Sequence, residues 1–218
     1  MGRDNHPRER QARALARKKG KRPPHPRVLI VTEGEKTEPQ YFDEIRKKLR
    51  ISAARIRIAD SDCGTEPRQI VDYAADLFRE QERQFDKVFA VFDRDEHRTY
   101  HDALQACART KLRNDQKKWV KFRAVPSNPC FELWLLLHCE DIHDLLHRNE
   151  IYRKLKQHIP DYEKAFPGTF ERTHPALRDA VIRAKRLQAR YRPEDDTEGP
   201  YTNVDTVVDL LLSMKRPD

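Results

Sequence analysis

Four short apolar segments alternate with helical patterns between residues 28 and 125, and this order constrains the fold more than any other feature. The apolar segments span residues 28–31, 55–59, 87–92 and 119–125. The segments between them carry apolar residues at helical spacing, over residues 37–49, 66–84 and 100–111. Such strict alternation is typical of parallel strands joined by right-handed helical crossovers. We therefore predict an α/β fold with a mostly parallel four-stranded sheet flanked by helices.

The two ends of the chain differ from this α/β segment. Residues 1–26 hold almost no large apolar residue and end in a proline-rich stretch, which predicts an arm without regular structure. From residue 128 onward only helical patterns follow, over residues 129–138, 141–157, 175–190 and 203–214. We expect a core over residues 27–127 and a helical C-terminal part, residues 128–218, packed on it.

The charge of the chain is concentrated in the arm. Lys and Arg exceed Asp and Glu by 44 − 36 = 8, and residues 1–27 hold ten Lys and Arg against Asp4 and Glu9. A basic arm attracts phosphate backbones without reading their sequence, so nucleic acid, either DNA or RNA, is the expected partner. A tail that only improves solubility is the alternative. The candidate contacts are Arg13, Arg17, Lys18, Lys19, Lys21 and Arg22.

Composition also bounds the compartment. No apolar run approaches the roughly 18 residues that cross a bilayer, and the basic N-terminus has no apolar signal region. The four cysteines form no CxxC pair, which suits a reducing cytoplasm. We expect a cytoplasmic protein with no membrane partner. A zinc site at His138, Cys139, His143 and His147 is disfavoured, because zinc ligands usually have tighter spacing.

Acidic residues follow the first and third predicted strands. Glu33 comes directly after the first strand, and Asp93 and Asp95 follow the third. Chemistry in parallel sheets collects beyond the carboxyl ends of the strands. Asp93 and Asp95 are two apart, so in an extended backbone both would point to one side. Converging carboxylates repel one another, and hard oxygen ligands suit Mg²⁺ or Mn²⁺. Solvent-exposed loop acids are the alternative interpretation.

Glu132 is a further candidate ligand. We expect Asn128 to cap a helix with Pro129 at its first position, which places Glu132 in the opening turn after the fourth strand. Glu132 would then lie at the same edge as Glu33 and Asp93. An acid that only complements the helix dipole is the alternative.

Longer sequence segments around these acids resemble those of known protein families. An apolar strand followed by Glu33-Gly34, and a later one followed by Asp93-Arg94-Asp95, resembles the Toprim domain of primases, topoisomerases and small nucleases. The string VTEGEKTEPQYF over residues 31–42 and the string PSNPCFELW over residues 126–134 look like the RloB-like family. This resemblance covers about residues 27–214 and leaves the basic arm outside it.

The resemblance implies a Toprim-type, Rossmann-like fold and metal-dependent phosphodiester hydrolysis. It assigns Glu33 as a metal ligand or proton-transfer group and Asp93 and Asp95 as metal ligands. Lys36, Glu35 and His97 are possible auxiliary residues, Lys36 because a lysine beside the phosphate would stabilise its charge. The family is associated with phage defence, including abortive infection, and is often encoded beside an ATPase of the ABC or OLD type. A nuclease, or nuclease subunit, of a prokaryotic defence system is therefore expected.

Three other functions compete with this expectation. The protein could be a catalytically silent Toprim scaffold that binds nucleic acid or a partner ATPase. Asp93 and Asp95 could instead be the nucleophile and acid of a haloacid-dehalogenase-type phosphatase, although that pair normally follows the first strand. Residues 34–37 faintly resemble a nucleotide-binding loop, but Leu29 stands where its first glycine is needed and Glu35 separates Gly34 from Lys36.

Overall fold

A computed structural model describes residues 25–61, 64, 66–95, 97–164, 166–194 and 199–215. Nearly all of the predicted arm, including its six candidate nucleic-acid contacts, lies outside the described residues. Within the described part of the chain, no helix combines the length and apolar character that crossing a membrane requires.

The centre of the fold is a mixed sheet with strand order β2-β1-β3-β4-β5. The four parallel strands are β1 (Val28–Thr32), β2 (Ile56–Asp60), β3 (Lys87–Asp93) and β4 (Lys121–Asn128). A fifth strand, β5 (Tyr201–Thr202), pairs antiparallel with the end of β4. The α/β class and the mostly parallel sheet are confirmed, but the prediction of four strands is wrong. Two paired residues carry no periodic pattern, so the sequence could not indicate β5.

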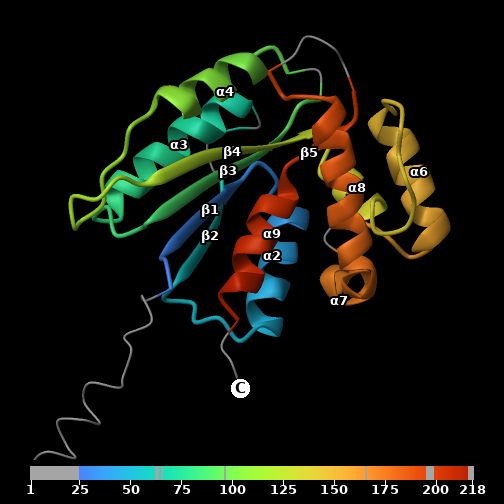
Figure 1. The fold of residues 1–218 in the computed structure, drawn as a ribbon, viewed down its shortest axis with the longest axis horizontal. Coiled ribbons are helices and arrows are strands. Elements are labelled where there is room, and N and C mark those ends of the chain that lie inside the picture. The colour runs from blue at the N-terminus through green and yellow to red at the C-terminus, as the bar shows by residue number, and fades with distance from the viewer. Residues whose placement is uncertain are drawn as a thin grey trace, which may run out of the picture.

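Helices cover both faces of the sheet. Helices α3 (Pro67–Glu80) and α4 (Tyr100–Arg109) lie on one face, and α2 (Thr37–Lys48) and α9 (Val204–Ser213) lie on the other (Figure 1). Residues of β1 alternate between the two cores: Val28 and Ile30 join the α2 side, and Leu29 and Val31 join the α3 side. Because β1 is covered on both faces, it is apolar throughout rather than alternating.

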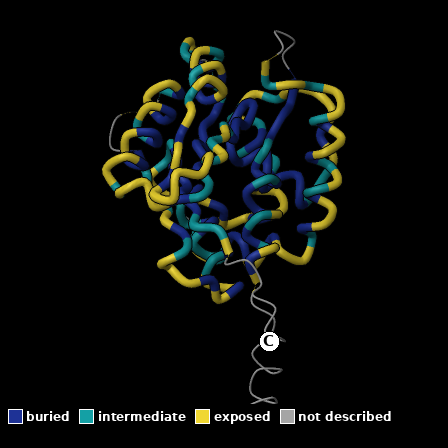
Figure 2. The backbone as a smooth tube through the Cα atoms, turned by 60° about the vertical axis from the view of Figure 1, so that its left-hand side comes forward, coloured by how far each residue is buried: buried dark blue, intermediate teal, exposed yellow. Residues whose placement is uncertain are grey.

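Besides β5 and α9, the C-terminal part consists of helices that pack on the α2 side of the core. They are α5 (Glu132–Leu136), α6 (Arg148–His158), α7 (Thr169–Thr173), a 3-10 turn η1 (His174–Ala176) and α8 (Leu177–Arg190). The helical C-terminal part is thus confirmed. In Figure 2 the buried backbone runs through the interior of the molecule, and exposed segments form its outer loops and helix faces.

Two predicted helix starts in this part are wrong. Asn128 does not cap a helix: it is the last residue of β4, its side-chain Nδ2 donates to the Gly199 carbonyl at 2.7 Å, and its peptide bond to Pro129 is cis. The helix instead begins at Glu132. Helix α6 begins at Arg148 rather than near residue 141, because the His147 side chain caps it by accepting the Asn149 N–H.

The strand order creates one crevice suited to binding. The chain leaves β1 toward β2 on one side, whereas β3 lies on the other side of β1. Between β1 and β3 the order of strands therefore reverses, and ligands of open α/β sheets bind at such a switch point, beyond the carboxyl ends of the strands.

Candidate functional site

Glu33 and Asp93 meet at this switch point. Thr32 at the end of β1 pairs with Val91 of β3, and the Glu33 N–H continues the ladder to the Val91 carbonyl at 3.0 Å. The Glu33 side chain then turns across β3, where its Oε2 accepts the backbone N–H of Asp93 at 2.8 Å. The expected convergence of these two acids is present in the structure.

Asp93 is a buried carboxylate among other acids. Its residue is only 7% exposed, and its Oδ1 accepts the backbone N–H of Phe131 at 2.9 Å. The pKa of the Asp93 carboxyl is raised well above its ordinary value. Burial is the largest cause, and the negative charges of Glu33, Glu38 and Glu132 add to it. A bound cation would relieve this accumulation of negative charge.

These acids line one cavity of about 470 Å³. Its acidic lining residues are Glu33, Glu35, Glu38, Asp93 and Glu132. Its basic lining residues are Lys36, Lys164 and Arg148. Glu35 and Lys36 are exposed at its rim, whereas Asp93 and Glu132 are buried. The cavity therefore has an acidic floor and cations on its walls, an arrangement suited to a metal ion together with a phosphate.

Glu38 is a site residue that our sequence reasoning missed. It lies in the first turn of α2 and is buried, and burial, with the charges of Glu132 and Glu33 adding to it, raises its pKa to about 7. Its carboxylate packs against Gly34, where a Cβ would overlap it. The sequence did contain a signal: Glu38 continues the buried stripe of α2 that holds Tyr41, Phe42 and Ile45.

Glu132 is held by two tyrosines. Its Oε1 accepts the hydroxyl of Tyr152 at 2.7 Å and that of Tyr162 at 3.3 Å. Burial, followed by the Glu132 charge, raises the pKa of both phenols, so both remain protonated donors at neutral pH. Glu132 lies in the opening turn of α5 and lines the cavity, as its position after the fourth strand indicated.

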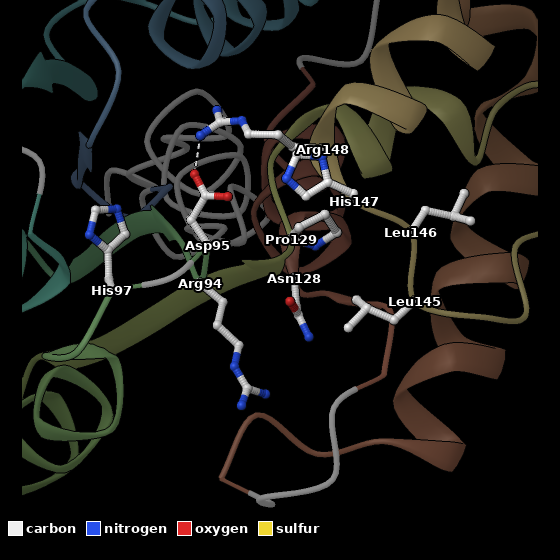
Figure 3. A pocket seen from close by; sticks show the side chains of 9 residues that line it. All are labelled: Arg94, Asp95, His97, Asn128, Pro129, Leu145, Leu146, His147 and Arg148. Carbon is white, nitrogen blue, oxygen red and sulfur yellow. Dashed lines mark hydrogen bonds and ion pairs between the residues drawn. The ribbon is translucent and has the colours of Figure 1, made fainter.

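Asp95 does not line the same cavity as Asp93, although its charge still acts on Glu33. Strand β3 ends at Asp93, and Asp95 adopts a left-handed backbone with φ of 37°. The extended geometry assumed from the sequence does not hold here, because Arg94 and Asp95 donate their N–H groups to the carbonyls of Ser127 and Pro129. Asp95 instead forms an ion pair with Arg148 and lines a neighbouring cavity of about 850 Å³ (Figure 3).

His97 connects Glu33 to a further carboxylate. Its Nε2 lies 3.8 Å from Glu33 Oε1, and its Nδ1 lies 3.4 Å from Glu66 Oε1. Glu66 is itself fixed by the Thr99 hydroxyl at 2.6 Å. At 3.8 Å His97 and Glu33 are not hydrogen-bonded, so a proton would pass between them through a bridging water or after a closer approach.

The donor atoms of this site suit Mg²⁺ or Mn²⁺, but the acidic side chains are too far apart to hold an ion in this structure. Glu33, Glu38, Asp93 and Glu132 offer the hard oxygen donors that these ions prefer. Among the described residues, however, no three His, Cys, Asp or Glu side chains stand close enough together to hold an ion.

The fold and the site together define an α/β protein with an acid-lined crevice at the switch point of its sheet. The chain matches the family model described as RloB-like protein over residues 28–211, and it belongs to that family. A search of curated proteins and a search of solved structures each found no match.

Proposed function

We propose that this RloB-like protein is a metal-dependent phosphodiesterase that cleaves nucleic acid with the aid of Mg²⁺ or Mn²⁺. The main support is the buried carboxylate of Asp93, which shares one cavity with Glu33, Glu38 and Glu132. Buried acids in such number are costly unless a cation neutralises them. The position of this cavity, at the switch point of the sheet, favours a substrate site over a purely structural role.

In this proposal Glu33, Asp93 and Glu132 would hold the metal, with Glu38 as a further acid of the same cavity. Asp95 would join them only if it left its ion pair with Arg148. The bound ion would polarise a phosphoryl oxygen and lower the pKa of a water molecule. Lys36, Lys164 and Arg148 line the same cavity and would bind the phosphate through its negative charge. His97 would accept or supply a proton through Glu33.

A silent scaffold is the second candidate. It is favoured by the lack, among the described residues, of three side chains already spaced to hold an ion. A phosphatase with Asp93 as nucleophile has less support, because Asp95, its expected acid partner, forms an ion pair with Arg148 instead.

Divalent-metal dependence separates the enzyme from the scaffold. The full chain would be incubated with single-stranded DNA, duplex DNA and RNA, in EDTA and in a titration of Mg²⁺ or Mn²⁺. We expect cleavage of at least one substrate that rises with metal and stops in EDTA. Metal-independent binding of all three substrates without any cleavage would favour the scaffold. Release of phosphate from a small phosphomonoester, with no chain cleavage, would favour the phosphatase.

The cellular setting is proposed from the family resemblance. We propose that the protein acts in the cytoplasm as part of a prokaryotic anti-phage defence system, with an ABC- or OLD-type ATPase as partner. Co-purification of such an ATPase with the tagged chain, and loss of phage resistance in the Glu33→Gln strain, would support this setting.

A further inference from the structure

We propose that Trp119 and the cations around it form a second binding site, which takes single-stranded nucleic acid. The site lies just before β4, at the amino-terminal edge of the sheet, whereas Glu33 and Asp93 lie at the carboxyl edge. It therefore goes beyond the proposed chemistry and does not depend on it.

Trp119 is the exposed member of the two tryptophans in the chain. It is 62% exposed, whereas Trp134 is completely buried and donates its Nε1–H to the Tyr41 hydroxyl. Arg113, paired with Trp119 in a short antiparallel bridge, places its guanidinium 4.2 Å from the indole centroid. The large exposure that remains leaves the opposite side of the indole free to stack against a planar group.

Trp119 stands between two hollows of the surface. One hollow, of about 590 Å³, is lined by Pro26, Asn114 and Gln116 among others, and Trp119 forms part of its wall. The other, of about 290 Å³, has Arg83, Lys111 and Arg113 on its walls, again with Trp119. The first hollow is large enough for a nucleobase, with an aromatic ring, a proline ring and side-chain amides on its walls. The acid on its wall, Asp86, is paired with Arg27.

Cations outnumber acids around Trp119. Asp86 and Asp115, the nearby acids, both pair with Arg27. Arg79, which lines the smaller hollow, pairs with Asp76. Among the described residues, no ion pair is formed by four other cations that line the two hollows, namely Arg83, Lys111, Arg113 and Lys118. This excess of positive charge is complementary to a phosphate backbone.

A like-charge pair next to this surface adds to the positive potential. Lys87 and Lys121 stand directly opposite each other at the starts of β3 and β4. Burial, followed by the charges of Lys121 and Arg123, lowers the pKa of Lys87. Like charges placed opposite each other destabilise a sheet, and a bound anion would offset that cost.

The basic arm enters the fold at this same place. The carbonyl of His25, the first described residue, accepts a hydrogen bond from Arg55 at 2.7 Å, and both residues line the larger hollow. Figure 1 shows the start of the described chain and the loop before β4 on the same side of the sheet. Residues 1–24 carry nine Lys and Arg. A nucleic-acid strand stacked on Trp119 would therefore lie close to the point where this basic arm joins the fold.

Stacking on Trp119 selects the single-stranded form. A base inside a duplex is already stacked on its neighbours, whereas an unpaired base can lie flat on an exposed indole. Stacking is tolerant of sequence, because every base presents a π-face. DNA and RNA share this chemistry, and the test therefore includes both.

Intrinsic fluorescence tests the proposal directly, because Trp134 is buried and Trp119 is exposed. The full chain is titrated in EDTA, which prevents metal-dependent cleavage, with oligo(dT) and oligo(U) of about 12 nucleotides. We expect quenching of the wild-type emission on binding. Trp119→Ala should weaken binding roughly tenfold, the order expected for one stacked base, and should abolish the quenching. Trp119→Phe should retain most of the affinity and lose the quenching.

Ile182→Ala is the matched control, since Ile182 is an exposed apolar residue on α8. It should bind both oligonucleotides like the wild type. Unchanged affinity and quenching in Trp119→Ala would overturn the proposal, as would duplex DNA quenching Trp119 more strongly than the single strands. Equal quenching by poly-glutamate would assign the surface to an acidic polypeptide instead. Because no cleavage is measured, failure here leaves the proposed nuclease chemistry untouched.

Discussion

The Glu33 carboxylate accepts the backbone N–H of Asp93 at 2.8 Å, which joins residues sixty positions apart in the chain. This bond fixes the end of β1 against the end of β3, the two strands between which the sheet reverses its order. One oxygen of Glu33 is thereby committed to the backbone, and the other faces His97. The same contact thus serves the fold and the candidate site.

Neutralising either acid should remove cleavage and leave the fold intact. Glu33→Gln keeps an oxygen that can accept the Asp93 N–H, and Asp93→Asn keeps one for the Phe131 N–H. We expect the rate of Mg²⁺-dependent cleavage to fall by roughly 10²- to 10³-fold, as for the loss of a few kcal/mol of metal-mediated stabilisation. Circular dichroism should stay unchanged. Normal cleavage by either folded variant would contradict the assigned site.

Gly34→Ala should be destabilising because of Glu38. A Cβ at position 34 would overlap the Glu38 carboxylate, so this buried side chain has to shift. Because the displaced group is the end of a flexible side chain, we expect a cost of about 1 kcal/mol, the low end for overpacking. In a Glu38→Ala background the same substitution should cost much less, because the overlapping group is gone. A double-mutant cycle of urea unfolding measures this coupling. Equal costs in the two backgrounds would show that the carboxylate does not restrict position 34.

His138 should make the protein less stable in mild acid. Burial lowers its pKa to about 4, its Nδ1 bonds the Trp134 carbonyl, and its Nε2 has no partner in the described structure. The unfolded chain therefore binds a proton between pH 6.5 and 4 that the folded chain does not. Above about pH 6.5 His138 does not lower the free energy of unfolding. As the pH drops to 4, its contribution lowers that free energy by about 3 kcal/mol.

His138→Phe isolates this effect. The difference between the wild-type and variant unfolding free energies, measured by urea titration from pH 4 to 8, should change with this sign and size. Taking the difference is necessary because Glu33, Glu38 and Asp93 have raised pKa values and contribute in the opposite sense. Parallel pH profiles for the two proteins would contradict the prediction.

Deleting residues 1–22 should weaken nucleic-acid binding and flatten its salt dependence. The deletion removes nine Lys and Arg, each able to pair with a phosphate. For every phosphate that the shortened chain no longer neutralises, the slope of log K against log salt should become shallower by about 0.7–0.9. Filter binding of the full and shortened chains across a salt series measures both quantities. An unchanged slope would reduce the arm to a solubility device.

The helical C-terminal part shows where local patterns were insufficient. Apolar spacing predicted helices there, but their starts depended on contacts with distant residues. Asn128 stays in β4 because it bonds Gly199, 71 positions away, and β5 exists only because the returning chain meets the end of β4. No local propensity contains such a contact.

The sequence by itself determined the α/β alternation, the two-sided burial of β1 and the meeting of Glu33 with Asp93. These follow from short-range periodicity and from the rule that parallel strands end at one edge. Only the tertiary structure decided that Glu38 joins the site and that Asp95 turns away to Arg148. The direction of a side chain beyond a strand end depends on the partners available in space. Those partners come from elements far away in the chain, which local sequence does not specify.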